Sequence, residues 1–275
     1  MSGTAPKGSE KPLPKKQQAI VEEHLPLRSP MVYEIVRQEG EIELRRPLAS
    51  LWWSGVAAGI AMFASVLAEG VLRHHLPDAT WRPLVESFGY GLGFLIVVLG
   101  RLQLFTENTV TAVLPLLSEW SRARLGHTAR LWGVVLAANF AGTFITAALV
   151  SWAGLFHAMH VDAMLELSRE FAAHPPLEAL MLGIPAGFLV AAIVWVSPSA
   201  EGSKFSIVVW MTWLIAVGGF THVVVGSAEM ALLLFAGEVG IVQALAVLGP
   251  TLAGNIIGGT GLFALLAYAQ IKGEI

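Results

Sequence analysis

Six stretches of this chain are each long and apolar enough to cross a membrane. About 20 apolar residues in a helix span the roughly 30 Å hydrocarbon core of a bilayer. The candidate spans are 47–72, 86–118, 131–156, 177–197, 205–236 and 241–270. Polar and glycine-rich letters, GRLQLFTEN and GGFTHVVVG, interrupt the second and the fifth. The pattern predicts an all-α integral membrane protein with six transmembrane helices, of which spans two and five are interrupted.

The composition supports a membrane protein and argues against an enzyme. Hydrophobic residues make up 55% of the chain and charged residues only 13%, whereas a soluble domain has about 25% charged residues. The chain has no cysteine, which excludes disulfides, thiolate metal sites and a cysteine nucleophile. It also lacks a phosphate-binding glycine loop, a G-x-S-x-G motif and a Cys/His metal spacing. We therefore expect no catalysis, no cofactor, no metal and no nucleic-acid partner.

Positive charges lie asymmetrically around the six stretches. If the N-terminus is inside, the cytoplasmic segments hold 13 of the 17 Lys and Arg residues. Cytoplasmic loops of membrane proteins carry such an excess. We therefore expect a multi-pass protein of a bacterial inner membrane, surrounded by lipid, with both termini in the cytoplasm.

The segments between and beside the spans also have characteristic compositions. Residues 1–30 are polar and lack the apolar core of a cleaved signal peptide, so they predict a disordered cytoplasmic tail. Residues 31–46 have the pattern of an amphipathic helix at the membrane interface. Residues 157–176 predict an outer loop with a short helix, and 271–275 a cytoplasmic C-terminus. The spans then form two groups of three, at 47–156 and 177–270.

The two groups of three spans resemble each other. Gly55-x-x-x-Gly59 matches Gly183-x-x-x-Gly187, Phe105-Thr106-Glu107 matches Phe220-Thr221-His222, and Asn139-x-x-Gly142-Thr143 matches Asn255-x-x-Gly258-Gly259. The matches have offsets of 128, 115 and 116 residues. Because each group has three spans, the second must enter the membrane from the opposite side. The sequence thus predicts an inverted 3+3 repeat with its axis in the membrane plane.

The interrupted spans mark the expected pore. In folds built from inverted repeats, the substrate lies near the midplane, where discontinuous helices face each other. Broken backbone at membrane depth is tolerated only where protein or a water-filled cavity covers it. The polar groups of LQLFTENT and GGFTHVV are therefore expected to face a lumen.

His222 is the first candidate for a pore residue. Ionisable side chains within a membrane are costly and usually line a path, although a core histidine bonded to a carbonyl is the plain alternative. Imidazole titrates near neutral pH and can donate or accept a hydrogen bond. Thr106, at the matching place in the repeat, is expected to bond the substrate or His222, or else a carbonyl freed by the helix break. Thr221 and Asn108 are weaker candidates, since capping a half-helix explains either.

Charged and aromatic residues near the breaks are the next candidates. Arg101 and Glu107 lie within a span and are expected either to pair with each other or to act on the substrate. Glu69 and Glu229 lie near span ends and are expected to be solvated. Phe94, Phe105 and Phe220 together predict apolar constrictions, which gate by size and dewetting. The residues expected to serve close helix packing are Asn139, Gly142, Asn255, Gly258 and Gly259.

Three motifs together resemble the formate/nitrite transporter family. LFTENTVT resembles the family's L-F-T-(G/S)-N loop, GGFTHVVVGSAEM its G-F-E-H-x-x-A-N-M stretch, and LAGNIIGGTGLF its G-N-x-x-G-G. The resemblance covers about residues 31–270. It implies an aquaporin-like protomer, a homopentamer with one pore per subunit, and passage of small monovalent anions such as formate, nitrite, lactate or hydrosulfide.

The resemblance also implies roles for single residues. Thr106 is the threonine of the span-two loop and His222 the central histidine. Phe94 and Ile215 fall where the family has its constriction residues, with Phe105 beside the loop. Departures from the family pattern are Glu107 for a small residue, Thr221 for glutamate, Gly226-Ser227 in the A-N-M stretch, Ile215 for an aromatic, Gly187 for an asparagine, and Phe171, with His174 nearby, for a lysine.

A proton-linked anion pore is the working hypothesis. A small anion bonds to Thr106 and His222, and His222, or water that it orients, supplies a proton. The neutral acid then crosses, because a bare charge in an apolar constriction costs several kcal/mol. The alternatives are a pore for a neutral or cationic solute such as water, ammonia or a small amine, and a non-conducting membrane scaffold or sensor with the same fold.

Overall fold

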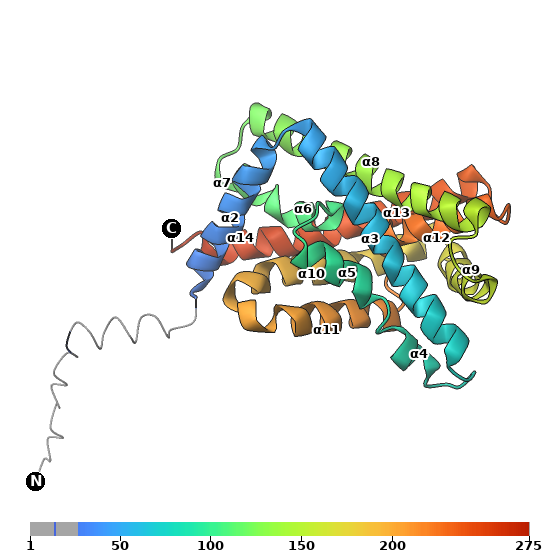
Figure 1. The fold of residues 1–275 in the computed structure, drawn as a ribbon. Coiled ribbons are helices and arrows are strands. Elements are labelled where there is room, and N and C mark those ends of the chain that lie inside the picture. The colour runs from blue at the N-terminus through green and yellow to red at the C-terminus, as the bar shows by residue number, and fades with distance from the viewer. Residues whose placement is uncertain (1–13, 15–26, 275) are drawn as a thin grey trace, which may run out of the picture.

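The computed structural model describes residue 14 and residues 27–274, and this part of the chain is helical and contains no strand (Figure 1). The all-α prediction is therefore confirmed for the described residues. Most of the predicted tail, at 1–13 and 15–26, and the last residue of the predicted C-terminal segment lie outside them.

The chain order alternates long helices with short ones. The α-helices are α2 (Ser29–Arg45), α3 (Leu48–His75), α4 (Arg82–Glu86), α5 (Gly91–Leu99), α6 (Phe105–Thr111), α7 (Leu114–Ser118), α8 (Arg122–Ala153), α9 (Ala158–Ala172), α10 (Pro176–Val196), α11 (Lys204–Val217), α12 (Val223–Phe235), α13 (Ile241–Ile256) and α14 (Leu265–Ile271). Two 3-10 turns, η1 (Ser197–Ser199) and η2 (Glu201–Ser203), precede α11, and a π-helix, η3 (Ile257–Ala264), joins α13 to α14.

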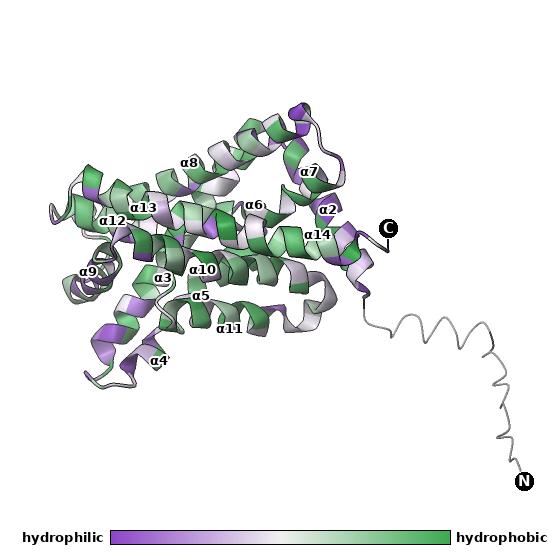
Figure 2. Ribbon diagram, turned by 180° about the vertical axis from the view of Figure 1, so that it is seen from behind, coloured by the Kyte–Doolittle hydropathy of each residue, from purple (hydrophilic) through white to green (hydrophobic). Residues whose placement is uncertain are grey.

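Five helical segments of the described chain are long and apolar enough to cross a membrane. They are Leu48–His75, Arg82–Leu99, Arg122–Ala153, Pro176–Ser199 and Ile241–Ile271. Each overlaps one predicted span. The remaining predicted span, 205–236, consists of two shorter apolar helices, α11 and α12. Figure 2 shows hydrophobic residues along these helices and hydrophilic residues gathered near α2 and α4.

Both predicted helix breaks are present, and backbone geometry explains where they fall. Helix α5 ends at Leu99 before Gly100, and α11 ends at Val217 before Gly218. The next residue adopts a left-handed conformation in each break, with φ of 52° at Arg101 and 64° at Gly219. Left-handed backbone costs a non-glycine residue about 1–2 kcal/mol. Arg101 is the one non-glycine residue with positive φ in the described chain.

Small residues let the long helices approach closely. A Cβ atom at Gly142 on α8 would lie 2.8 Å from the backbone nitrogen of Ile60 on α3. A Cβ atom at Gly258 on η3 would lie 2.8 Å from the backbone nitrogen of Phe188 on α10. No real Cβ contact is that short, so glycine is required at both positions. The pairs α3–α8 and α10–α13/η3 thus form two close-packed walls.

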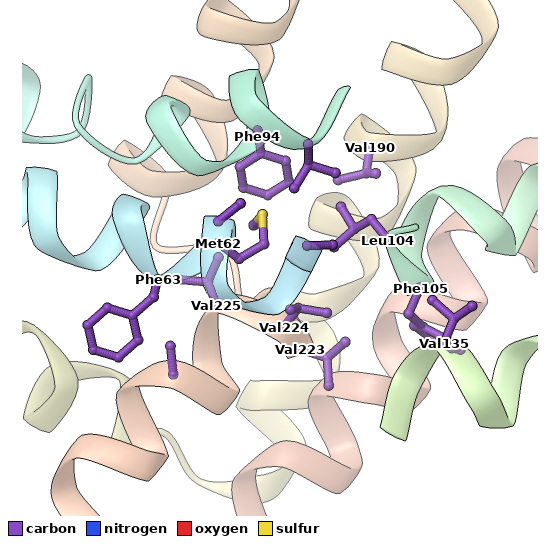
Figure 3. Close-up of a cluster of buried hydrophobic side chains, with 14 of the residues drawn as sticks. Met62, Phe63, Phe94, Leu104, Phe105, Val135, Val190, Val223, Val224 and Val225 are labelled. Carbon is purple, nitrogen blue, oxygen red and sulfur yellow. The ribbon is translucent and has the colours of Figure 1, made fainter. Parts of the chain in front are cut away.

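The half-helices α6 and α12 lie between these walls, within the main apolar cluster. Phe94, Leu104 and Val190 belong to this cluster together with Val223 and Val224 (Figure 3). Each of these five side chains is at most 2% exposed. The start of each half-helix is therefore covered by protein. The breaks themselves are exposed at Gly100, Arg101, Gly218 and Gly219.

Two amphipathic helices pack against the ends of the bundle. Helix α2 buries Val32, Val36 and Leu44 and contacts α7 and α14. Helix α9 contacts α3 and α12 (Figure 1). These are the helices predicted at 31–46 and 157–176, and they lie at opposite ends of the bundle (Figure 1).

Candidate functional site

A buried asparagine holds the first helix break. The Asn139 side chain on α8 donates to the carbonyls of Gly55 at 2.9 Å and Gln103 at 2.8 Å. Its Oδ1 accepts a hydrogen bond from the backbone N–H of Phe105 at 2.9 Å. Asn139 is fully buried. One amide side chain therefore satisfies a carbonyl and an N–H that the helix break leaves without helical partners.

A second asparagine does the same at the second break. The Asn255 side chain on α13 donates to the carbonyls of Gly183 at 2.8 Å and Thr221 at 2.9 Å. Its Oδ1 accepts from the backbone N–H of Val223 at 2.9 Å. The sequence predicted only close helix packing for Asn139 and Asn255. Their hydrogen bonds to the backbone on both sides of a helix break, here called bracketing, were not predicted.

The shared hydrogen bonds correct the register of the repeat. Gln103 corresponds to Thr221, 118 positions later, because the carbonyl oxygen of each accepts a hydrogen bond from the asparagine side chain at its break. Leu104 and His222 are likewise the N-cap residues of α6 and α12. The alignment of Phe105-Thr106-Glu107 with Phe220-Thr221-His222 was therefore wrong by three residues. Thr106 is not the counterpart of His222; Leu104 is.

Thr106 and His222 nevertheless meet. Thr106 Oγ1 lies 2.8 Å from His222 Nε2, and the side chains are 0% and 1% exposed. The backbone N–H of Val225 donates to His222 Nδ1 over 3.4 Å. An Nδ1 that accepts leaves the proton of a neutral imidazole on Nε2. Nε2–H then donates to Thr106 Oγ1, and the threonine hydroxyl keeps its own hydrogen to donate.

An apolar ring covers the histidine. Phe94 is fully buried, and its ring centroid lies 5.0 Å from that of His222 in an edge-on arrangement. Leu104, 1% exposed, is in the same cluster (Figure 3). Leu104 was not among the predicted pore residues, and its position at the N-cap of α6 is the signal that could have identified it.

Two cavities open on either side of this contact. The first, called here the α2 vestibule, has a volume of about 200 Å³ and is lined by residues that include Glu39, Glu43, Arg101, Glu107 and Lys204. The second, the α9 vestibule, has a volume of about 130 Å³, and its lining is Glu69, Tyr90, Leu167, Glu170, Phe171, His174, Ala216, Gly219, Phe220, Thr221, His222 and Glu229. The cavities share no lining residue, and Thr106 and Phe94 line neither. The two cavities are therefore separate in this structure.

The other predicted constriction residues do not all face this point. Phe105 packs against Trp132 on α8, with ring centroids 5.6 Å apart, and lies beside Val135 (Figure 3). Ile215 is fully buried in the apolar cluster. Phe220 lines the α9 vestibule. Of this set, Phe94 is the one whose ring packs edge-on against His222 among the described aromatic pairs.

Polar candidates on the other side gather at the α2 vestibule. Asn108 donates to Gln103 Oε1 at 3.1 Å, and Gln103 Nε2 donates to Glu43 at 2.7 Å. Arg101 and Glu107 line this vestibule, but the described ion pairs include none between them. Thr221 is on the opposite side, where its hydroxyl donates to the carbonyl of Ala179 at 2.7 Å.

Gly226 and Phe171, two departures from the family pattern, lie against each other. A Cβ atom at Gly226 would lie 2.7 Å from a ring carbon of Phe171. The Phe171 ring thus occupies the space that a side chain at 226 would need. The neighbouring Ser227 hydroxyl lies 2.9 Å from Thr143 Oγ1 and holds α12 to α8.

The expectation that Glu69 is solvated was wrong. Its side chain is 8% exposed, and it faces the α9 vestibule together with Glu229, which is half-buried. Position along a span suggested solvent access, but α9 packs over this end of α3. Gly70 permits that contact, since its missing Cβ would lie 2.6 Å from a side-chain carbon of Met164.

Histidines from two segments also lie close together near α9. The ring centroids of His74 and His75 lie 5.6 and 5.7 Å from that of His160, and the centroid of His157 lies 5.9 Å away. Within residue 14 and residues 27–274, however, no group of three or more His, Asp or Glu side chains is arranged to hold a metal ion.

The model of a protein family described as "Formate/nitrite transporter" matches residues 30–269, which is most of the chain. The chain belongs to the formate/nitrite transporter family. It is therefore a transmembrane protein of a family of transporters and channels, not of enzymes, and the resemblance in its motifs is confirmed.

Similar proteins agree with this membership in formate/nitrite transporters. The chain is 42% identical to "Inner membrane protein YfdC" of Escherichia coli K12, covering 94% of this chain and 84% of that protein. A solved "FNT family ion channel" aligns with a TM-score of 0.77 at 20% identity, over 87% of this chain and 98% of that one. A "Pentameric formate channel with formate bound" aligns with a TM-score of 0.69 at 20% identity, over 82% and 97%. The two structures show that the fold is shared.

Proposed function

We propose that this chain forms a pore for small monovalent weak acids of the size of formate and nitrite. The observation that carries the proposal is the buried Thr106–His222 contact, which lies between two cavities that open from opposite ends. Membership in the formate/nitrite transporter family supports the substrate class, as does the formate named for a structural neighbour.

The contact supplies hydrogen-bond donors to an oxyanion. If the Thr106–His222 bond opens, Nε2–H of His222 and the Thr106 hydroxyl can each donate to an oxygen of the permeating molecule. Helix α12 begins after His222, and the positive end of a helix dipole favours negative charge within its first turn. Replacement of one hydrogen bond by two keeps the buried polar groups satisfied while the solute passes.

The apolar ring requires that the solute cross without a full charge. Phe94, whose ring lies edge-on to His222, is buried with Leu104 and Val190 in one apolar cluster (Figure 3). None of the three side chains offers a polar partner. An isolated charge in such surroundings costs several kcal/mol or more. We therefore propose that the acid crosses protonated and that flux is linked to protons, with Thr106 and His222 as the binding residues at the narrowest point.

The proposal extends to topology and assembly. Matching asparagine brackets at the two breaks support an inverted repeat of three plus three spans, aquaporin-like, in which α11 and α12 together make the fifth. Charge asymmetry supports cytoplasmic termini, and YfdC, described as an inner membrane protein, supports that location. The pentameric neighbour supports a homopentamer, with lipid covering the remaining apolar faces.

Flux measurements on the purified full-length protein in lipid vesicles test the proposed function. Influx of formate, nitrite, methylamine and glycerol is followed by stopped-flow light scattering between about pH 5 and pH 8. We expect formate and nitrite to enter faster than into protein-free vesicles, and faster as the outside becomes more acidic. Entry of methylamine or glycerol without formate would favour a cationic or neutral solute, and entry of none would favour a non-conducting scaffold.

A further inference from the structure

The α9 vestibule is unexpectedly acidic for an entrance to an anion pore. Its lining includes three carboxyl side chains, Glu69, Glu170 and Glu229, and no Lys or Arg. Charged side chains at pore mouths commonly select the opposite charge. A negatively charged lining would therefore repel the free anion that the central contact is proposed to pass.

Glu69 lacks the partners that a buried carboxylate needs. It is 8% exposed, and the described contacts give it no hydrogen bond and no ion pair, although it lines the cavity. The hydroxyl of Tyr90, on the same wall and 6% exposed, likewise has no described partner. A carboxylate removed from water without a partner takes up a proton instead of remaining charged. Glu69 is thus placed to hold a proton where its side chain lines the cavity.

Nearby charged groups do not change this assignment. Arg73, one helical turn away, forms ion pairs with Glu86 at 3.2 Å and Glu170 at 2.8 Å. His174 lies 3.4 Å from Glu178. The remaining titratable groups that line the cavity are Tyr90, His222 and Glu229. The cation closest along the helix is therefore already neutralised by two other carboxylates.

The central histidine is poorly placed to supply a proton itself. Its Nδ1 accepts from Val225, which leaves the neutral ring with a proton on Nε2. Loss of that proton would produce an anionic imidazole in an apolar cluster. His222 can donate a hydrogen bond in this state, but the proton for a permeating anion has to come from another group.

We propose that Glu69 and Glu229 form a proton-exchange site for weak-acid anions in the α9 vestibule. This inference rests on the proposed function. An O–H bond of a carboxyl breaks and its proton forms a new O–H bond with an oxygen of the anion, which becomes the neutral acid and moves on to Thr106 and His222. The carboxylate left behind regains a proton from a hydronium ion in the vestibule, which becomes water. Conjugate bases of weak acids fit this site, whereas strong-acid anions such as nitrate and chloride cannot accept the proton.

The test compares E69Q/E229Q with wild type in vesicles, using formate and nitrate influx at about pH 7 and about pH 5. Glutamine keeps the size and polarity of the side chain but has no carboxyl proton to transfer. The matched control is E166Q, because Glu166 is an exposed carboxyl on α9 that does not line the cavity. Circular dichroism and detergent thermal unfolding establish that each variant is folded.

We expect E69Q/E229Q to lower formate influx at about pH 7 by at least about tenfold, a modest part of what a positioned proton donor contributes. At about pH 5 the solution holds roughly a hundredfold more formic acid, and influx should approach the wild-type rate. Wild type and E166Q should exclude nitrate.

Other outcomes separate the two proposals. Unchanged formate influx in E69Q/E229Q at about pH 7 would overturn the exchange site while leaving the weak-acid pore intact. An equal loss at both pH values would also overturn it, because a structural defect would not be relieved by acid. If wild type carries no formate at any pH, both proposals fail.

Discussion

Thr106 Oγ1 and His222 Nε2 lie 2.8 Å apart, although the residues are separated by 116 positions in the chain. The bond joins the first turn of α6 to the N-cap of α12, so it connects the two half-helices directly. It also lies between two cavities that share no lining residue. In the proposed pore, passage of a solute requires this bond to break.

Removal of the threonine hydroxyl should weaken both the fold and the flux. In T106V the buried Nε2–H of His222 loses its partner, which costs about 1–3 kcal/mol. We expect a lower midpoint of thermal unfolding in detergent and slower formate influx. T106S keeps the hydroxyl and should stay near wild type in both measurements. Equal behaviour of T106V and T106S would show that the hydrogen bond is unimportant.

Loss of either bracketing asparagine should be more damaging. N255L leaves the carbonyl of Thr221 and the N–H of Val223 without the partner that the structure gives them. Each unsatisfied buried group costs about 1–3 kcal/mol, so about 2–6 kcal/mol is expected. N139L should behave alike, because it makes the corresponding bonds at the first break. Unfolding in denaturant measures the loss of stability, and alanine at exposed Gln270 is the control. Near-native stability of N255L would contradict the role of Asn255 in holding the helix break.

The π-helix η3 offers a matched pair of glycine substitutions. A Cβ atom at Gly258 would overlap the backbone of α10, whereas the nearest atom to a Cβ at Gly261 is a side-chain carbon 3.9 Å away. We expect G258A to destabilise the protein by about 1–3 kcal/mol or more, as overpacking does, and G261A to be tolerated. The measurement is the yield and unfolding midpoint of each variant, and equal tolerance would indicate that α10 and η3 are less tightly packed.

Much of the fold was predictable because membrane crossing imposes strong composition rules. Long apolar stretches located the helices, and the glycine-rich breaks fell where they were expected. Helix ends depend on local backbone preferences that single residues indicate, such as the glycines that follow α5 and α11, Gly100 and Gly218. The fifth predicted span did not appear as one long helix, because its break divides it into α11 and α12.

The site was predictable only in part. His222 and Thr106 stood out because polar residues at a break are unusual, and the structure brings them together. Their relation to the repeat was misjudged, since FTE and FTH look alike as letters while hydrogen bonds to Asn139 and Asn255 set the true register. Leu104 has no polar group, so only its place directly before α6 could have marked it. The burial of Glu69 depends on how α9 packs over α3, a tertiary contact that sequence periodicity does not report.

The Arg169–Glu238 pair predicts a pH-dependent position of α9. Arg169 donates to both carboxylate oxygens of Glu238, at 2.6 and 2.7 Å, and holds the pKa of Glu238 below its usual value. The contribution is present above the ordinary glutamate pKa of about 4.3 and is lost as pH falls through the lower folded value. Because both side chains are partly exposed, the effect should be small.

Hydrogen exchange of α9 measures this effect. After correction for the intrinsic rate, exchange in wild type should rise when the pH falls below the pKa of the Glu238 carboxyl in the folded protein. E238Q should show the faster exchange at every pH. If acid changes α9 in wild type and E238Q by the same amount, the pair does not hold the helix.

Cysteine modification measures whether permeating formate reaches the Thr106–His222 contact, because the chain itself contains no cysteine. T106C and, as a control, E166C on the exposed face of α9 are reconstituted in vesicles and treated with a small methanethiosulfonate reagent. Labelling is quantified by mass spectrometry and formate influx is measured. We predict that modification of T106C stops formate influx and that formate slows the modification, while labelled E166C conducts normally. Full labelling of T106C with undiminished formate influx would contradict this prediction.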